Sequence, residues 1–171
     1  MSVSTPVLQF VPVKNDSQIA SVARLAHEIW YEYYPPLIGR AQVDYMVSKF
    51  QSPAALARQV AEGYEYFLME REGGHVGYFA VLVNREEQSL FLSKLYVLQR
   101  ERRSGTGRRA MEFIEQLARD RGLKLLWLTV NKGNPAVKAY ERLGFKIAAD
   151  LVMDIGGGFV MDDFRMEKGL G

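Results

Sequence analysis

Glycines and arginines are concentrated in one short segment of the sequence, and this combination suits the binding of phosphate. Residues 100–109 read RERRSGTGRR, with five arginines and a single glutamate. The whole chain has a formal net charge of only +2, so the remaining residues together are slightly acidic. Guanidinium groups make charge-assisted hydrogen bonds to phosphate oxygens, and glycines let a ligand approach the main chain closely. The segment therefore predicts a site for a small, multiply charged anion. Nucleic acid would instead require basic charge spread along a face or groove.

The basic segment lies between two stretches with a regular hydrophobic pattern. Before it, residues 89–98 form a largely apolar run, which predicts a central strand. After it, apolar residues recur at helical spacing over residues 108–121, and Gly122 follows as a stop signal. The start of a helix leaves main-chain N–H groups unpaired and carries about half a positive charge. The placement therefore predicts a diphosphate-binding turn at residues 102–107.

Two other phosphate motifs describe this segment less well. A Walker loop requires Gly-x4-Gly-Lys followed by Ser or Thr, and the chain contains no such string. The pattern Gly105-x-Gly107-x-x-Ala110 matches the loose dinucleotide signature of the Rossmann fold. That signature should follow its strand at once, but six residues separate Leu98 from Gly105. In addition, no acidic residue ends the next expected strand, where the chain has Asn131.

Hydrophobic period and turn residues predict an α+β chain with one mixed sheet and helices on both faces. No repeat, linker or low-complexity tract divides the sequence, so we expect a single domain over residues 1–171. The predicted helices are residues 18–31, 42–50, 53–61, 108–121 and 134–143. The predicted strands are residues 7–13, 64–70, 76–83, 89–98, 123–130 and 145–153, with a last strand after the glycines at 156–158. Pro35 and Pro36 are expected to break the chain after the first helix.

Composition excludes several classes of protein and of chemistry. With 48% hydrophobic and 25% charged residues the chain resembles an average globular protein. It contains no cysteine, which excludes disulfides, thiolate metal sites and a cysteine nucleophile. Only two histidines are present, and we expect no metal site. The first residues, MSVSTPVLQFVPV, do not resemble a signal peptide, and no apolar run reaches the ~18 residues of a membrane span. We therefore expect a cytoplasmic protein without membrane or nucleic-acid partners.

Two sequence motifs carry a resemblance to a known family. The segment LYVLQRERRSGTGRRAM resembles the coenzyme A motif of the GNAT superfamily of N-acetyltransferases, with the match Arg102-x-x-Gly105-x-Gly107. Downstream, NPAVKAYERLGFKI is similar to the closing motif of the same superfamily, which includes Asn134 and Tyr140. The two motifs occur in the expected order and together cover about residues 89–147.

The resemblance implies a fold that binds acetyl-CoA and a set of residues that contact this cofactor. The fold would be a single GNAT-like domain whose mixed sheet has about seven strands, with a central pair, residues 89–98 and 123–130, that splays apart. Main-chain groups exposed by the splay would bind the pantetheine arm, while the glycine–arginine turn would bind the pyrophosphate. The implied cofactor-binding residues are Leu95, Tyr96, Val97, Arg102, Arg103, Ser104, Gly105, Thr106, Gly107 and Arg108, together with Asn131 or Asn134.

The resemblance also implies a catalytic acid and leaves the base open. Tyr140 matches the family tyrosine that protonates the departing thiolate of coenzyme A, and a phenol has a pKa suited to this transfer. Without a cysteine, direct attack of a neutral amine on the thioester is the economical route. Many relatives supply a glutamate base on the central strand, but this chain has no acid there. The candidate bases are Glu28, Glu32, Asp154 and the Asp162-Asp163 pair.

The expected acceptor is a small, cationic, polyamine-like amine. Aromatic residues and a carboxylate gather in WYEYYPP near the end of the first helix, and such groups suit an amine. The C-terminal glycine turn with its carboxylates resembles the hairpins of the bacterial spermidine/spermine-type acetyltransferases. The expected acceptor residues are Trp30, Glu32, Tyr34 and Asp154. A protein N-terminus or lysine as acceptor, and a non-catalytic acyl-CoA-binding module, remain alternatives, and a homodimer stays open.

Overall fold

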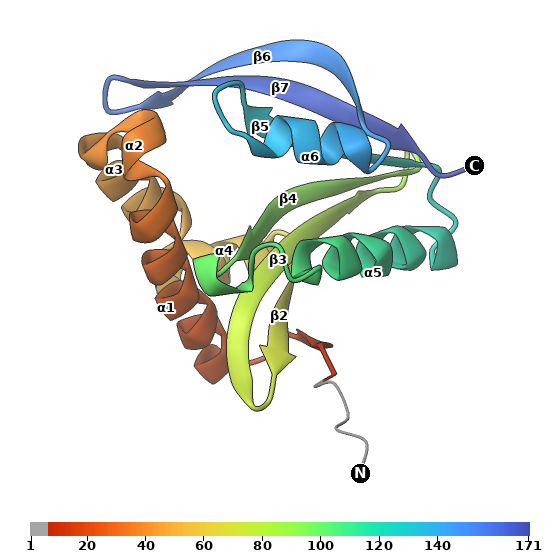
Figure 1. The fold of residues 1–171 in the computed structure, drawn as a ribbon, viewed down its shortest axis with the longest axis horizontal. Coiled ribbons are helices and arrows are strands. Elements are labelled where there is room, and N and C mark those ends of the chain that lie inside the picture. The colour runs from red at the N-terminus through yellow and green to blue at the C-terminus, as the bar shows by residue number, and fades with distance from the viewer. Residues whose placement is uncertain (1–6) are drawn as a thin grey trace.

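The sheet of this protein has seven strands, with helices on both of its faces (Figure 1). The computed structural model describes residues 7–171. The strand order is β1-β2-β3-β4-β5-β7-β6, and only the central β4–β5 pair is parallel. The strands are β1 (Gln9–Pro12), β2 (Glu65–Arg71), β3 (Gly74–Asn84), β4 (Ser89–Val97), β5 (Leu125–Asn131), β6 (Lys146–Gly156) and β7 (Phe159–Gly169). The expected mixed sheet is confirmed.

The helices begin and end close to the positions that the sequence predicts. They are α1 (Asp16–Tyr33), α2 (Pro35–Ile38), α3 (Arg40–Phe50), α4 (Pro53–Ala61), α5 (Thr106–Asp120) and α6 (Ala136–Arg142). Asn15 begins α1 with a capping box, and Ser52 caps α4 through its side chain. The prolines after α1 have a second effect that we did not predict: Pro35 opens α2, because proline is tolerated in the first turn of a helix.

Two hydrophobic cores lie on opposite faces of the sheet. One core packs α5 against the sheet around Phe79, Met111 and Ile114, and α6 lies on the same side. The other packs α1, α3 and α4 around Ile29, Leu56 and other apolar residues. Burial of these two apolar layers is the main force that holds the helices on the sheet. As a result, the ends of α1, α5 and α6 are fixed around the centre of the sheet.

The central pair of strands separates after a short parallel ladder. Pairing between β4 and β5 covers only Ser89–Leu92 and Leu125–Leu128, although both strands continue further. On the other side of β4, the register with β3 shifts, because Ala80 lies opposite Lys94 whereas the next residue lies opposite Leu92. Ser93 is therefore an extra residue in β4, and such a bulge bends its strand. The expected splay is confirmed, and it leaves the second half of β4 unpaired on the side of β5.

The β6–β7 hairpin is attached to α3 at its tip. Tyr45 and Lys49 both donate hydrogen bonds to the main-chain oxygen of Ile155, at 2.7 and 2.6 Å. Gly157 has a φ of 62°, and a Cβ atom there would lie 2.8 Å from the Tyr45 ring. A side chain at this position would therefore meet both backbone strain and a steric clash. The glycine turn lets the hairpin approach the helical layer that contains α1.

Candidate functional site

The turn between β4 and α5 presents a row of main-chain N–H groups. A short 3-10 helix, Gln99–Glu101, leads into it, and α5 begins directly after Gly105. Gly105 has a φ of 84° and Arg103 has a φ of 68°, so the chain passes twice through the left-handed region. The N–H groups of residues 103–108 donate no hydrogen bond to another residue in the described part of the chain. Such a row at a helix N-terminus is suited to the oxygens of a phosphate group.

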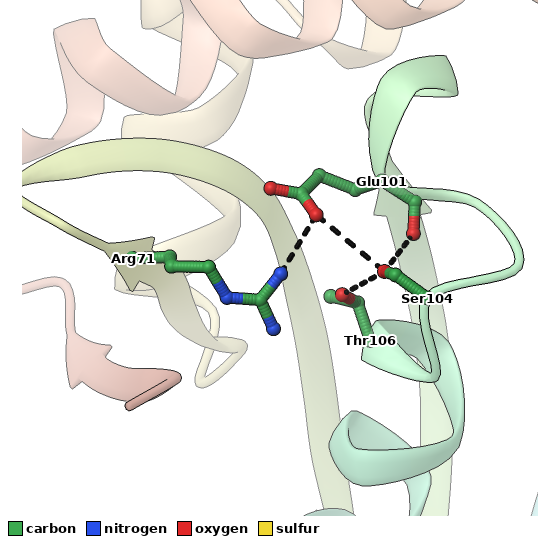
Figure 2. A network of polar contacts seen from close by, with 4 residues as sticks. All are labelled: Arg71, Glu101, Ser104 and Thr106. Atoms are coloured by element: carbon green, nitrogen blue, oxygen red, sulfur yellow. Dashed lines mark hydrogen bonds and ion pairs between the residues drawn. The ribbon is translucent and has the colours of Figure 1, made fainter. Parts of the chain in front are cut away.

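The turn is held in place by a polar network that reaches across to β2 (Figure 2). Arg71, at the end of β2, forms an ion pair with the carboxylate of Glu101 at 2.7 Å. The Ser104 hydroxyl donates to the main-chain oxygen of Glu101 and lies 2.9 Å from the hydroxyl of Thr106. Thr106 is fully buried. The only acid in the basic segment therefore serves the geometry of the turn, and the side chains of Ser104 and Thr106 fix it internally.

The space above the turn is open and electropositive. A Cβ atom built on Gly105 or Gly107 would meet nothing within 4 Å. Within residues 7–171, the five arginines of the segment form no ion pair with a carboxylate. Their charge therefore remains available to an anion, in addition to the partial positive charge at the start of α5. Residues 103–108 combine the donors, the charge and the open space that a diphosphate requires.

The unpaired edge of β4 continues from this turn into the splay. The amide of Leu98 donates to the oxygen of Val76 on β3, at 2.9 Å. Because main-chain groups alternate along a strand, those of Leu95 and Val97 point away from β3, toward the side of β5. In agreement, the Arg102 guanidinium reaches within 3.5 Å of the Val97 oxygen. Leu95 and Val97 thus carry the groups that an extended ligand in the splay could bind.

Tyr140 lies on α6, half-buried beside the core that contains α5. Its ring packs edge-on against Phe145, with centroids 5.8 Å apart. Burial, and to a smaller extent the nearby Tyr33, raise the pKa of Tyr140 to about 12. Tyr140 also lies close enough to Tyr34 and Tyr96 to raise the pKa of each phenol. This phenol stays protonated at neutral pH and is available as a proton donor.

Tyr33 joins three parts of the site, and sequence reasoning missed it. Its hydroxyl donates to the side-chain oxygen of Asn134 at 2.9 Å, and the Arg102 guanidinium lies over its ring at 4.1 Å. Asn134 is buried and also accepts from the amide of Ala136, at the start of α6. Asn131, in contrast, accepts from Gly133 within the turn after β5. Tyr33 therefore links the end of α1 to Arg102, at the start of the turn before α5, and to Asn134.

An aromatic wall extends from the end of α1 to β4. Trp30 stacks on Tyr34 with ring centroids 4.2 Å apart, and it meets the edge of Tyr96 at 5.5 Å. Tyr33 packs edge-on against Tyr34 at 4.9 Å. Burial raises the pKa of Tyr34 and Tyr96 well above the usual value. The structure thus brings Tyr34 beside Tyr96 and Tyr140, whereas Trp30 is buried behind them.

Two expected acceptor residues have other partners in the structure. Glu32 is exposed, and its carboxylate accepts a hydrogen bond from the amide of Gln99 at 2.6 Å. Asp154 is also exposed and accepts from the amide of Gly156, which places its carboxylate in the hairpin turn. Both carboxylates therefore stabilise local structure: Glu32 connects α1 to the start of the phosphate turn, and Asp154 stabilises the β6–β7 turn.

A buried acid, Asp163, lies on β7 next to the end of β5. It is only 3% exposed and is opposite Asn131 in the strand register. Its pKa is raised to about 6, chiefly by burial and also by Asp162, while Lys132 acts in the opposite direction. Asp163 in turn raises the pKa of Tyr96, so the two side chains are electrostatic neighbours. The sequence predicts Asp163 only as part of the Asp162-Asp163 pair of candidate bases, because the burial of one member depends on strand register.

Two other kinds of feature, a metal-binding cluster and a membrane-spanning helix, are absent from the described residues. Residues 7–171 contain no group of three or more histidine, aspartate or glutamate side chains placed to hold a metal ion. None of the helices in that range is long and apolar enough to cross a bilayer. The arrangement around β4 therefore consists of main-chain donors, arginines, phenols, one buried carboxylate and the buried Lys94, whose ammonium group donates to Phe50, Gln51 and Gln59. These groups can hold a phosphorylated, extended ligand and move protons at its far end.

Comparisons with known proteins agree with this geometry. Residues 22–145 match the family model described as "Acetyltransferase (GNAT) family". An uncharacterised N-acetyltransferase of Mycobacterium bovis is 28% identical over 71% of this chain and 79% of its own length. The streptothricin acetyltransferase of Streptomyces lavendulae is 34% identical over 50% of this chain and 46% of its own length. The PaiA N-acetyltransferase of Thermoplasma acidophilum, solved with coenzyme A, has a TM-score of 0.77 at 16% identity, over 95% of this chain and 99% of its own.

Structural similarity extends to several acceptor branches of this fold. A spermidine N-acetyltransferase from Vibrio cholerae matches with a TM-score of 0.68 at 15% identity, over 95% of this chain and 94% of its own. The ribosomal-protein-S18-alanine N-acetyltransferase of Escherichia coli matches with a TM-score of 0.73 at 19% identity, over 96% of this chain and 95% of its own. The spermidine/spermine-type branch that the sequence suggested is therefore not singled out by the fold, because other branches match as well.

Proposed function

Because the chain belongs to the GNAT family of acetyltransferases, and is thus an acetyl-CoA-dependent N-acetyltransferase, we propose that its acceptor is a small polyamine-like primary amine. The observation that carries this proposal is the aromatic wall of Tyr33, Tyr34 and Tyr96 beside the splay. Aromatic faces attract an ammonium group, and hydroxyl groups can orient it. Transfer then occurs by direct attack in a ternary complex, since the chain has no cysteine to carry an acyl group.

The cofactor would be held by main-chain groups and arginine charge. The N–H groups of residues 103–108 would bind the pyrophosphate, and Arg108 would lie near the adenosine phosphates. Leu95 and Val97 would offer main-chain groups to the pantetheine arm, along the unpaired edge of β4. Asn131 or Asn134 would contact the same arm; the side-chain oxygen of each already accepts from a nearby main-chain amide, and that of Asn134 also accepts from Tyr33. Bound acetyl-CoA supplies an activated acetyl thioester, and these contacts would orient it.

Tyr140 would donate the proton that the leaving sulfur needs. It lies on the helix that follows β5, close to Tyr34 and Tyr96 of the aromatic wall. Its raised pKa keeps the phenol protonated until a strong base develops nearby. A thiolate forming in the same apolar surroundings is also destabilised by desolvation, and this favours proton transfer to it.

The acceptor is tested by a panel of amines with detection of free thiol. The panel would contain spermidine, spermine, streptothricin, a peptide with an N-terminal alanine and a lysine-containing peptide. We expect thiol release with the polyamines at a kcat/KM at least about tenfold higher than with either peptide. Preference for a peptide would assign a protein acceptor instead. Binding of acetyl-CoA without thiol release from any amine would contradict the catalytic function.

A further inference from the structure

We propose that Asp163 is the general base that takes a proton from the acceptor amine. This inference rests on the proposed function, and it fills the position left open by the missing acid on β4. The structure supplies three observations for it: the burial of Asp163, the absence of a partner among the described residues, and its place beside Tyr96 at the open end of the splay. Together these observations distinguish Asp163 from the other acids considered above.

Strand register directs Asp163 to the acceptor side of the sheet. On β7, Phe164 packs in the core that contains α5, whereas Met161 packs in the core that contains α1. Side chains alternate along a strand, so Asp163 points to the same face as Met161. Tyr96 on β4 also packs in the α1 core. Between Tyr96 and Asp163 lie β5 and the region where β4 and β5 have separated, which is where the acetyl group would be placed.

The charged groups around Asp163 are engaged with one another. On the same strand, Asp162 pairs with Lys132 at 3.0 Å, and Lys132 also reaches Asp150 of β6. Arg165, two residues along the same face, pairs with Glu167 at 2.8 Å, and its guanidinium lies over Trp127. Asp163 itself forms no ion pair and no side-chain hydrogen bond with another residue in the range 7–171.

A buried carboxylate without a partner is costly, and a protein usually retains one where it has a task. The other candidate bases lack this property. Glu28 and Glu32 are exposed on α1, and Glu32 is bound to Gln99. Asp162 is exposed and paired, and Asp154 belongs to the hairpin turn. Asp163 is the one of these acids that is both buried and unengaged among the described residues.

The proton transfers balance when Asp163 and Tyr140 act together. The ionised carboxylate of Asp163 accepts one proton from the arriving ammonium, directly or through a water. The neutral nitrogen then forms a bond to the acetyl carbonyl carbon, and the carbon–sulfur bond breaks with its electron pair on sulfur. Tyr140 gives its phenolic proton to that sulfur, and the extra proton of the new amide returns to Tyr140 through solvent. Asp163 releases its proton to solvent, so one thiol, one amide and one proton are formed.

The acidity of Asp163 suits this role. Its pKa of about 6 lies below neutral pH, so the carboxylate is ionised there, yet it is more basic than an ordinary aspartate. Asp162 raises this pKa and Lys132 lowers it, while Tyr96 faces the group from β4. We therefore expect kcat/KM for a polyamine to rise with pH through about 6 and then to level off. The rise would follow the ionisation of Asp163, because the base and not the amine determines the acidic side of the pH profile.

The test is Asp163→Asn, compared with wild type across pH. The variant should lose about 100-fold or more in kcat at pH 7, with the Kd of acetyl-CoA unchanged. Its activity should keep rising with pH toward the pKa of the amine itself, near that of lysine at ~10.4, because only the neutral amine then reacts. A weakly basic primary amine, already neutral at pH 7, should restore most of the lost rate.

The matched control is Asp162→Asn, which changes the exposed neighbour and should keep the wild-type kcat at pH 7. Because Asp162 raises the pKa of Asp163, the pH profile of this control should move toward lower pH and not toward the pKa of the amine. An Asp163→Asn enzyme with wild-type kcat would overturn the inference while leaving the proposed function intact. The same holds for a variant that loses activity with no change of pH profile and no recovery with the weakly basic amine. If the wild type itself acetylates no amine, the proposed function fails, and the inference fails with it.

Discussion

At the scale of single residues, the site depends on phenols whose surroundings differ. Tyr33 donates to Asn134, whereas Tyr140 has no side-chain hydrogen-bond partner among the described residues and keeps its proton because it is buried. Tyr34 and Tyr96 are held in the aromatic wall with strongly raised pKa values. In the proposed function the same side-chain type would therefore perform three tasks: positioning, proton donation and acceptor binding.

Removal of one hydroxyl should separate the role of Tyr140 from its packing. Tyr140→Phe keeps the ring against Phe145 and removes only the proton donor. We expect kcat to fall about 100-fold or more with little change in the Kd of acetyl-CoA, because the hydroxyl acts when the sulfur leaves. Steady-state kinetics and calorimetric titration would measure the two quantities. Tyr64→Phe, a half-buried tyrosine before β2, is the control, and an unchanged kcat in Tyr140→Phe would remove Tyr140 from the acid role.

At the scale of elements, the start of α5 has the geometry of a preformed anion site. Its amides point out of the turn because Gly105 takes a left-handed conformation, and Glu101 is fixed by Arg71 rather than opposing the ligand. A short parallel ladder holds β4 and β5 together at one end only, so the edge of β4 opens toward this turn. The proposed cofactor site would thus consist mostly of main-chain groups, with glycines that leave space for the ligand.

A side chain at Gly107 should therefore harm the cofactor site without harming the fold. In Gly107→Val the added atoms enter space that contains no protein atom within 4 Å of the Cβ position. We expect the KM of acetyl-CoA to rise on the order of tenfold, a loss of about 1.4 kcal/mol, with the melting temperature nearly unchanged. Gly169→Val, where a Cβ atom also meets nothing within 4 Å, is the control. Equal KM values for Gly107→Val and wild type would place the pyrophosphate elsewhere.

At the scale of the whole molecule, one buried charge sets function against stability. Asp163 is ionised at neutral pH although its side chain, on β7, is almost completely buried. Its folded-state pKa of about 6 lies above the ordinary value of 3.8, so ionisation opposes folding. This contribution is absent below about pH 4, where both states are protonated, and is complete above about pH 6. Functional sites commonly carry such a cost.

Thermal or denaturant unfolding across pH should detect this opposition. Asp163→Asn should be more stable than wild type at pH 7 by about 2–3 kcal/mol, since two pKa units correspond to roughly that free energy. The difference should shrink as pH falls from 6 to 4, because the wild-type carboxyl then takes up its proton. Asp162→Asn, at an exposed position, should show no comparable gain. A variant less stable than wild type at pH 7 would mean that the carboxylate has a stabilising partner.

The order of elements was largely evident in the sequence, whereas their contacts were not. Hydrophobic period and capping residues such as Asn15 and Ser52 act over a few positions, so helices and strands could be predicted near their observed ends. The short helix at Pro35 was missed because proline signals both a break and a helix start. The predicted acceptor residues Glu32 and Asp154 both accept hydrogen bonds from main-chain amides. Gly156 lies two residues from Asp154 in the sequence, whereas only the folded chain brings Gln99 near Glu32.

The sequence by itself determined the order of helices and strands, and it predicted the diphosphate-binding turn and Tyr140 from short runs of neighbouring residues; both site assignments stay predictions. Only the tertiary structure decided which acid is buried, since the burial of Asp163 follows from the register of β7 against β5 and β6. It also decided that Tyr33 meets Asn134, a contact between residues 101 positions apart. Local geometry depends on neighbours in the chain, but burial and long-range contacts depend on how the sheet and its helices pack together.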